Sequence, residues 1–562
     1  MFFSTAIARG AALLAGVVLT AAPLSAQTPL TWTNATVVGD YNSGSLSNIA
    51  VDAAGNVYET RTFLGSAQIG NQTLVSTTSS DALLAKYSPA GVLLWVRQLS
   101  SAGPDSGFDV EVDAAGNCYV AGYFAGPITL GNGVELTSTT TSTKAYVVSY
   151  APDGTVRWAQ QSSATGASGT AVLGNSLAVD AAGAVYLAGR FQQQARFGNT
   201  ILNAPAESSG EAAFVAKFAA ANGALLLAIP AYYYARPAPN ASALYQAPQL
   251  AVSPAGDITL ATYFSGRPVF GPVTLTSQGR NDVLLARYSA TGTLQWVQQF
   301  GGPQDELVSQ VKTDAAGNTY LAGSYEGSPS FGTTPLPAAA VPNAFLAKYS
   351  AVGQPDWVQP GSSASLSRWM DLALDATGAP YVTGYFSGET RYGTTPPVVL
   401  TSAGGTDAVV AAYTPQGQAL WAQAGAGTYV DMGTTLGLDA QGSVYVAGFF
   451  TTAATFGPVR LSLPSTANNR FLARLSTTTL ARQEARTQAL GLYPNPATSV
   501  LQVPALPAGT AVQFVDARGR VARHATVGSG AQVSVRGLAP GLYILRTSTA
   551  QGQQFAGRVV VE

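Results

Sequence analysis

Residues 51–58 read Val51-Asp52-Ala53-Ala54-Gly55-Asn56-Val57-Tyr58, and this stretch is the first of seven copies of one motif. The Asp side chain can accept hydrogen bonds from turn amides and the Gly can take a positive φ, so the motif predicts a tight hairpin between two strands. The other copies start at Asp113, Asp180, Ser253, Asp314, Asp375 and Asp439, at intervals of 61, 67, 73, 61, 61 and 64 residues. This period predicts seven similar supersecondary units.

A calcium-binding loop is the alternative interpretation of this motif. Such a loop needs several oxygen ligands at alternating positions. The copies offer one carboxylate followed mostly by alanines. We therefore expect a structural turn.

A second motif follows each turn and supplies two more strands. Its first copy is Asp81-Ala82-Leu83-Leu84-Ala85-Lys86-Tyr87, followed by the turn Ser88-Pro89-Ala90-Gly91 and a strand that reaches Trp95. The counterparts of this tryptophan are Trp158, Leu227, Trp296, Trp357 and Trp421. A fixed strand position indicates a packing residue rather than a ligand platform. A Phe-Gly element between the two motifs, as at Phe197-Gly198, predicts an extra short hairpin.

Four antiparallel strands repeated seven times predict an all-β chain with a seven-bladed β-propeller at residues 27–476. The alternative, a parallel β-helix, has shorter repeats and needs no hairpin turns. The last copy ends after residues 471–475 without a fourth strand, whereas Leu30-Thr31-Trp32-Thr33 form a strand without a preceding unit. We predict that the segment around Trp32 pairs with residues 471–475 and closes the last blade.

These motifs resemble the SBBP-type β-propeller repeat of secreted bacterial proteins, over nearly all of residues 28–476. The resemblance implies a fold but no shared activity. The third copy departs through Leu227 and the insertion Tyr232–Pro237, and the fourth has Ser253 in place of Asp. These departures indicate either a specialised loop or sequence drift.

The first 26 residues have the pattern of a secretory signal peptide. Arg9 precedes an apolar stretch from Ala11 to Leu24, and Ser25-Ala26-Gln27 offers a cleavage site after Ala26. A membrane anchor is the weaker alternative, because a spanning helix needs about 20 apolar residues. No later segment resembles a membrane span, so we expect no transmembrane segment after signal removal.

After a linker at 477–489, residues 490–562 contain short strands that predict a small immunoglobulin-like β-sandwich. Three motifs in this part resemble the type A sorting domain of the type IX (Por) secretion system, and their residues are Tyr493, Pro494, Asn495 and Pro496, then Asp516, Gly519 and Arg520, then Gly541 and Tyr543. The resemblance implies recognition by the outer-membrane translocon and a secreted or outer-surface location in a diderm bacterium. The alternative is an ordinary binding sandwich.

Composition limits the chemistry. The net charge of −1 provides no basic field for nucleic acid. The only cysteine is Cys118 and the only histidine is His524, which lies outside the repeats, so we expect no cofactor and no metal site built on His or Cys in the propeller. Carboxylate chemistry stays open, as in glycoside hydrolysis, and its candidate acids are Asp109, Glu111, Asp305, Glu306, Asp371 and Asp431.

One register before the turns is polar in every copy. It comprises Asn48, Asp109, Ser176, Gln249, Gln310, Asp371 and Thr435, each flanked by an apolar residue. This alternation predicts a polar ring at the mouth of the channel, formed either by solvated strand ends around a wet channel or by a site for a glycan or peptide. Three functions stay open: a non-catalytic binding or adhesion module, a carboxylate-dependent polysaccharide hydrolase or lyase, and a structural envelope protein.

Overall fold

The computed structural model describes residues 30–40, 48–77, 79–138, 142–163, 171–235, 247–394, 396–463, 468–477, 488–504, 506–516, 520–548 and 554–562. The predicted signal peptide lies outside these residues, as does most of the predicted linker. The described chain forms β-strands and no α-helix, which confirms the predicted all-β class. It divides into two compact units, Met1–Thr477 and Thr478–Glu562.

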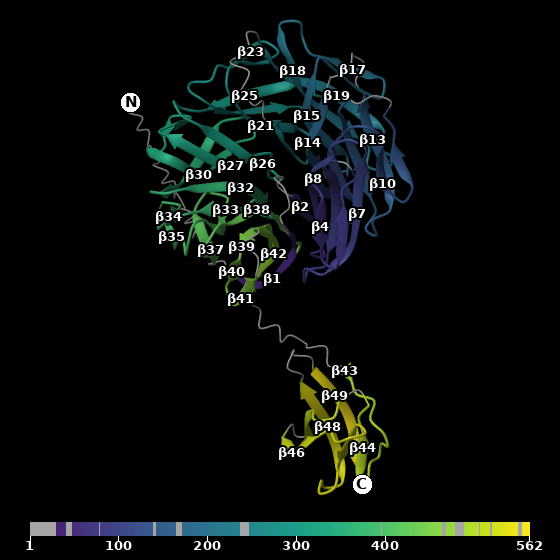
Figure 1. Ribbon diagram of the computed structural model, residues 1–562. Coiled ribbons are helices and arrows are strands. Elements are labelled where there is room, and N and C mark those ends of the chain that lie inside the picture. The colour runs from purple at the N-terminus through teal and green to yellow at the C-terminus, as the bar shows by residue number, and fades with distance from the viewer. Residues whose placement is uncertain are drawn as a thin grey trace, which may run out of the picture. The chain divides into compact units, whose positions relative to one another are not determined.

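Seven sheets in the described part of the first unit share one order of strands (Figure 1). We number them as blades 1 to 7 by their innermost strand. The innermost strands are β2 (Asn48–Val51), β8 (Ser106–Val112), β14 (Val172–Val179), β20 (Gln249–Val252), β26 (Glu306–Thr313), β32 (Ser367–Leu374) and β38 (Asp431–Leu438). Each lies beside the next, and β38 lies beside β2, so the inner strands form a closed ring.

Three further strands complete each blade. The second strands are β3 (Val57–Phe63), β9 (Cys118–Phe124), β15 (Val185–Gln192), β21 (Ile258–Phe264), β27 (Thr319–Gly327), β33 (Pro380–Phe386) and β39 (Val444–Thr451). The third strands are β6 (Asp81–Tyr87), β12 (Lys144–Tyr150), β18 (Ser208–Phe218), β24 (Asp282–Tyr288), β30 (Ala339–Tyr349), β36 (Asp407–Tyr413) and β42 (Asn468–Ser476). The fourth strands are β7 (Leu93–Ser101), β13 (Val156–Ser163), β19 (Leu225–Ala235), β25 (Leu294–Phe300), β31 (Pro355–Ser363), β37 (Ala419–Gly427) and, for blade 7, β1 (Thr31–Asp40).

The Asp turns form the hairpins between first and second strands. In the first copy the backbone N–H groups of Ala54 and Asn56 donate to Asp52 Oδ1 at 3.0 and 2.8 Å, and Gly55 has φ 82°. These bonds satisfy turn amides that have no partner in the strand ladder. The aspartate therefore has the structural role that its spacing predicts.

The Phe-Gly elements and their counterparts form the expected short hairpins. Six of them extend the blade before their own, whereas the hairpin at residues 330–335 is a separate two-stranded sheet that meets blade 4 through a bridge between Gly301 and Ser330. The hairpins are β4 (Ser66–Ile69) with β5 (Gln72–Val75), β10 (Ile128–Gly131) with β11 (Val134–Leu136), β16 (Gln194–Phe197) with β17 (Thr200–Asn203), β22 (Pro268–Phe270) with β23 (Val273–Thr274), β28 (Ser330–Phe331) with β29 (Thr334–Pro335), β34 (Glu389–Tyr392) with β35 (Val398–Thr401) and β40 (Ala453–Phe456) with β41 (Val459–Ser462). The hairpin of repeat 2, for example, joins the outer strand β7 of blade 1 through β10. Successive repeats are thereby interlocked at their outer edges.

The last blade is assembled from both ends of the first unit. Strand β1 pairs antiparallel with β42, with Trp32 opposite Leu475. The Trp32 side chain is buried against blade 6, where its indole N–H donates to Ala424 O at 3.1 Å and its ring lies 5.1 Å from that of Phe456. This pairing covers an edge of β42 that would otherwise be open.

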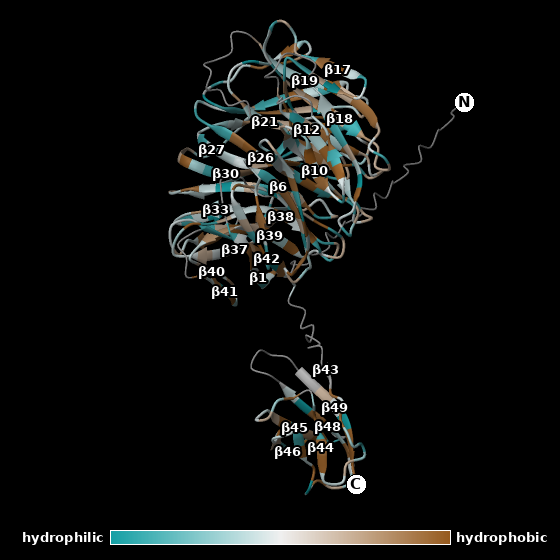
Figure 2. Cartoon of the chain, turned by 45° about the vertical axis from the view of Figure 1, so that its right-hand side comes forward, coloured by the Kyte–Doolittle hydropathy of each residue, from teal (hydrophilic) through white to brown (hydrophobic). Residues whose placement is uncertain are grey.

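Tryptophans on the fourth strands join neighbouring blades. The indole N–H of Trp158 in blade 2 donates to Ala220 O of blade 3 at 2.8 Å. A Cβ on Gly223 would lie 2.6 Å from Trp158, so only glycine leaves room for the ring. Trp95, Trp296 and Trp357 make the same kind of bond to the following blade. Apolar clusters fill the space between sheets, so hydrophobic residues are interspersed along the strands (Figure 2).

The second unit has its own core. Its five-stranded sheet has the order β43 (Gln488–Ala489), β49 (Gln554–Val561), β48 (Gly541–Ser548), β45 (Ala511–Asp516), β46 (Val521–Thr526), and β44 (Val500–Gln502) pairs with β47 (Gln532–Ser534). Leu501, Phe514, Val533 and Leu545 are buried together between these strands. Residues 1–29 aside, neither unit contains, among its described residues, a helix long and apolar enough to cross a membrane.

Candidate functional site

The polar ring lies on the inner strands, where β-bulges interrupt the pairing of several blades. In β8 the register with β9 shifts between Gly107 and Asp109, and β14, β26, β32 and β38 shift at the same place. A bulge turns backbone groups out of the ladder, so they need other partners. Gln249 begins β20 and pairs with Ala261.

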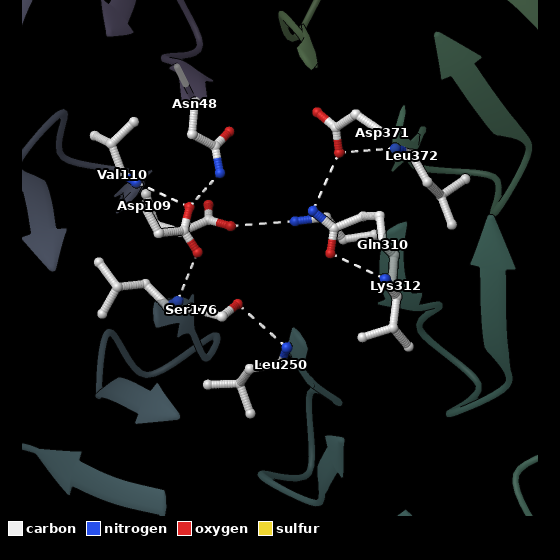
Figure 3. Close-up of polar contacts among 12 residues, drawn as sticks. Asn48, Asp109, Val110, Ser176, Leu250, Gln310, Lys312, Asp371 and Leu372 are labelled. Atoms are coloured by element: carbon white, nitrogen blue, oxygen red, sulfur yellow. Dashed lines mark hydrogen bonds and ion pairs between the residues drawn. The ribbon is translucent and has the colours of Figure 1, made fainter. Parts of the chain in front are cut away.

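Ring side chains provide those partners for the apolar residue that follows each ring position. The donating amides and their acceptors are Ile49 to Thr435 at 3.2 Å, Val110 to Asp109 at 2.9 Å, Leu177 to Asp109 at 2.6 Å, Leu250 to Ser176 at 3.2 Å, Val311 to Gln310 at 2.9 Å, Leu372 to Asp371 at 2.8 Å and Leu436 to Asp371 at 2.8 Å. Four of these bonds reach from one blade to the next. The ring is therefore a belt of hydrogen bonds that joins inner strands (Figure 3).

Side chains of the belt also bond to one another. Asn48 Nδ2 donates to Asp109 Oδ1 at 2.5 Å, and Gln310 Nε2 donates to Asp371 Oδ1 at 3.1 Å. Thr435 Oγ1 donates to Asp371 Oδ2 at 2.9 Å. Asp109 and Asp371 thus use both carboxylate oxygens within the belt, and both are only 6% exposed.

Two residues further along each inner strand, one ion pair crosses the channel. Five blades have small residues at this position, namely Ala50, Ala178, Ala251, Ala373 and Gly437. Blades 2 and 5 have Glu111 and Lys312, whose Oε1 and Nζ lie 3.2 Å apart. Strands β8 and β26 are separated by two inner strands on one side and three on the other, so the pair spans the axis (Figure 3).

A cavity of about 300 Å³ surrounds this pair and reaches Asn48, Gln310 and Asp371 of the ring. Burial alone would lower the pKa of Lys312, but Glu111, Asp371 and Asp109 outweigh it and raise that pKa above its ordinary value. Burial, with a further contribution from Glu111, raises the pKa of Asp109. We did not predict Lys312 from the sequence, although a register with five small residues, one acid and one base could have indicated it.

The six candidate acids do not meet in one place. Asp109, Glu111 and Asp371 lie at the axis, whereas Asp305 and Glu306 lie at the start of β26 and Asp431 at the start of β38. Asp305 accepts from Asn281 Nδ2 at 2.7 Å, and Glu306 accepts from Gly302 N–H at 2.8 Å. In the described part of the chain, no group of three or more His, Cys, Asp or Glu side chains could hold a metal ion.

Buried carboxyl groups occur in pairs at three junctions between blades. The pairs are Asp81 with Asp105, Asp282 with Glu306, and Asp407 with Asp431, each separated by 24 residues in sequence and each fully buried. Burial, assisted by the neighbouring acid, raises the pKa of Asp105 to about 7, of Glu306 to about 8 and of Asp431 to about 7. Asp105 accepts from Ser101 N–H and Glu306 from Gly302 N–H, and these two bonds join successive blades, whereas Asp407 accepts from Gly427 N–H within blade 6.

The predicted sorting residues take structural positions in the second unit. Asn495 accepts from Val560 N–H at 2.8 Å and donates to Arg558 O at 3.0 Å, while Tyr493, Pro494 and Pro496 are exposed. Arg520 Nε and Nη2 donate to Asp516 Oδ2 at 3.1 and 3.0 Å. Tyr543 OH donates to Ala539 O at 2.9 Å, Gly541 begins β48, and Gly519 lies outside the described residues.

Three known proteins resemble this chain, each at low sequence identity. A region of 213 residues is 22% identical to an uncharacterized WD repeat-containing protein, L264, of Acanthamoeba polyphaga mimivirus; it covers 32% of this chain and 15% of that protein's length. The quinohemoprotein alcohol dehydrogenase of Comamonas testosteroni is 10% identical, with a TM-score of 0.36 and coverage of 79% of this chain and 76% of its own. BamB of Moraxella catarrhalis is 13% identical, with a TM-score of 0.34 and coverage of 80% and 100%. These likenesses assign no activity to the chain.

Residues 491–562 match the family model described as a secretion system C-terminal sorting domain. The matched region contains the Tyr-Pro-Asn-Pro, Asp516–Arg520 and Gly541–Tyr543 motifs. The second unit is a C-terminal sorting domain, and the protein is secreted or held at the cell surface of a bacterium with a type IX secretion system.

Proposed function

We propose that this protein is a non-catalytic binding or adhesion module with SBBP-type repeats, exported after removal of residues 1–26 and displayed to an extracellular glycan or protein. The sorting domain would be recognised by the outer-membrane translocon. A carboxylate-dependent polysaccharide hydrolase or lyase is the alternative.

The observation that supports binding over catalysis is that both oxygens of each ring carboxylate, Asp109 and Asp371, already accept hydrogen bonds from the protein. A glycosidase acid or nucleophile must face its substrate with a free oxygen. Asp109 and Asp371 give both oxygens to the belt, and Glu111 is paired with Lys312. Removing Asp109 or Asp371 from such a site would expose unsatisfied amides, so these residues are poorly suited to change their bonding during a reaction.

We place the proposed ligand contact at the axial cavity. The ring residues Asn48, Asp109, Ser176, Gln249, Gln310, Asp371 and Thr435 would shape it, while Glu111 and Lys312 would meet the ligand. The side chains of Glu111 and Lys312 are 27% and 30% exposed, so a polar group of the ligand can reach them and replace one partner of the ion pair.

The test uses the secreted protein on glycan and peptide arrays. Glu111→Ala with Lys312→Ala removes the pair and leaves the belt intact, and Glu111→Lys with Lys312→Glu is the matched control that keeps an ion pair. The double-alanine variant should lose binding of the hits at least about tenfold, corresponding to about 1.4 kcal/mol. Undiminished binding would place the site elsewhere, blank arrays would contradict a binding role, and new reducing or unsaturated sugar ends would favour the enzyme.

A further inference from the structure

Blade 4 lacks a tyrosine that six blades share at the second residue of their second strand. The shared residues are Tyr58, Tyr119, Tyr186, Tyr320, Tyr381 and Tyr445, and blade 4 has Thr259 there. In four blades this ring lies next to the fourth-strand tryptophan, with centroids 6.1 Å apart for Tyr58–Trp95, 5.9 Å for Tyr119–Trp158, 6.0 Å for Tyr320–Trp357 and 6.1 Å for Tyr381–Trp421. Trp296 of blade 4 has no such tyrosine beside it.

Two more positions of blade 4 change together with Thr259. Ser253 stands where the other blades have the turn aspartate, and a carboxylate appears instead at Asp257. Arg287 stands where blades 1, 3 and 5 have a lysine and where blade 7 has Arg474, which lies over Tyr445. In blades 1, 3 and 5 that lysine lies over the shared tyrosine ring, at 4.6, 4.6 and 5.3 Å from its centroid. The lysine–tyrosine stack is thus replaced by a different set of groups.

Arg287 takes over one contact of the missing tyrosine. In blade 1 Tyr58 OH donates to Gly116 O of the next turn at 3.0 Å, and in blade 4 Arg287 Nη1 donates to the equivalent Gly317 O at 2.8 Å. Arg287 Nη2 lies 3.1 Å from Asp257 Oδ2. The guanidinium bridges blades 4 and 5 but does not fill the volume of a tyrosine ring.

A cleft of about 580 Å³ lies between blades 4 and 5, with Arg287 and Gly317 in its walls; Thr259 itself is fully buried and does not line it. The walls of the cleft also include Trp296, Asp257, Gln295 and the exposed Val352. Arg287 is only 3% exposed, and its Nε has no hydrogen-bond partner among the described residues. Since that nitrogen is enclosed by the protein, the groups that the cleft presents include the Trp296 indole and the Asp257 carboxylate, whose side chain is 26% exposed.

The chemistry of these walls fits a sugar. The charges of Arg287 and Asp257 cancel, so the cleft does not select for a charged ligand. An indole packs against the apolar C–H face of a pyranose, while Asp257 can accept from ring hydroxyls and the exposed Gln295 amide can donate to one. The volume lies within the range of about 300 to 1,000 Å³ typical of small-ligand pockets.

We propose that the cleft between blades 4 and 5 binds a neutral hexose unit of an extracellular glycan. This inference rests on the proposed binding function but uses a site apart from the axial cavity. The indole of Trp296 is the platform, and Asp257 and Gln295 orient the sugar hydroxyls.

The experiment restores the shared pattern, in which the tyrosine lies beside the tryptophan and reaches the next turn; in blade 4 the counterparts of those two groups, Trp296 and Gly317, line the cleft. In Thr259→Tyr with Arg287→Lys, the tyrosine should occupy the space beside Trp296 and stack under the lysine. Trp296→Ala removes the platform, and its matched control is Trp357→Ala, which takes away the equivalent tryptophan of blade 5. Binding of maltohexaose, cellohexaose, laminarihexaose and mannohexaose to the secreted protein is measured by titration calorimetry and tryptophan fluorescence.

We expect at least one hexasaccharide to bind. Its affinity should fall by at least about tenfold in both blade 4 variants and stay within about twofold of the original in Trp357→Ala. The restoring variant should melt at or above the original temperature, which separates loss of the site from loss of the fold. Unchanged affinity in the restoring variant would overturn the proposal, as would failure of every hexasaccharide to bind. If saccharide binding is lost only when the Glu111–Lys312 pair is removed, the cleft proposal fails while the proposed function stands; blank glycan and peptide arrays would overturn both.

Discussion

Glu306→Gln should flatten the dependence of stability on pH. Glu306 is fully buried at the junction of blades 4 and 5, and its Oε2 accepts from Gly302 N–H at 2.8 Å. Burial raises its pKa from 4.5 to about 8, with smaller contributions from Asp282, Asp305 and Glu326. The folded protein therefore holds this proton up to about pH 8, whereas the unfolded chain releases it near pH 4.5.

The sign and size of the effect follow from proton linkage. Between those two pKa values the folded state binds one more proton than the unfolded state, so the free energy of unfolding falls as pH rises. The slope is about 1.4 kcal/mol per pH unit for one group, or roughly 5 kcal/mol over the whole interval. Glutamine carries no proton to lose and its Oε1 can still accept from Gly302 N–H. The variant should thus match the original protein near pH 5 and exceed its stability near pH 8.

Guanidinium unfolding followed by tryptophan fluorescence at about pH 5, 6, 7 and 8 measures this slope. The original protein keeps further slope from Asp105 and Asp431, whose pKa values are raised to about 7, so the variant should lose only part of the dependence. Glu135→Gln, at an exposed position, is the matched control and should leave the slope unchanged. Parallel curves for Glu306→Gln and the original protein would refute the assignment of a buried, protonated carboxyl.

Three further outcomes test other parts of the structure. Trp32→Ala should lower the free energy of unfolding by about 3 to 5 kcal/mol, because a buried indole on the closing strand is lost; an unchanged calorimetric melt would mean that β1 does not close the ring. A chain ending at Ala485 should stay out of the culture medium and off the cell surface, as detected by immunoblot, and its normal export would contradict the sorting role of the second unit. Glu111→Gln should destabilise the fold by roughly 1 to 3 kcal/mol, since Lys312 loses its nearest partner; adding Lys312→Met should restore most of that loss, and a failure to do so would show that the pair is not the cause.

Local patterns in the sequence were sufficient for much of the propeller. The Asp turn and the Phe-Gly hairpin depend on residues within a few positions of each other, so the period of the repeat predicts both. The pairing of the Trp32 segment with residues 471–475 also followed, because one unpaired strand at each end of the repeats leaves one blade to complete.

The hydrogen bonds of the belt were harder to predict, because β-bulges in the inner strands determine which groups meet. Alternation predicts that Asp109 faces the channel, but the register shift between Gly107 and Asp109 determines which amides its carboxylate meets. The axial ion pair joins Glu111 and Lys312, which are 201 residues apart. Such a contact depends on ring closure and on two opposite strands, so no local spacing reveals it.

The seven repeats bring equivalent positions around the axis, so a ligand without sevenfold symmetry is most readily recognised where one blade differs from the others. Two such differences lie at the proposed sites. Among five small residues, Glu111 and Lys312 introduce a polar pair across the channel. In blade 4, Thr259, Asp257 and Arg287 replace a lysine–tyrosine stack that other blades use to hold their turns. In blade 7, Arg474 stands at the position of Arg287, pairs with Asp439 and lies over Tyr445, so the missing tyrosine is what sets blade 4 apart. In blade 4 the bridge from Arg287 to Gly317 keeps a contact with the following turn although the tyrosine is absent, so the two blades stay joined beside the cleft.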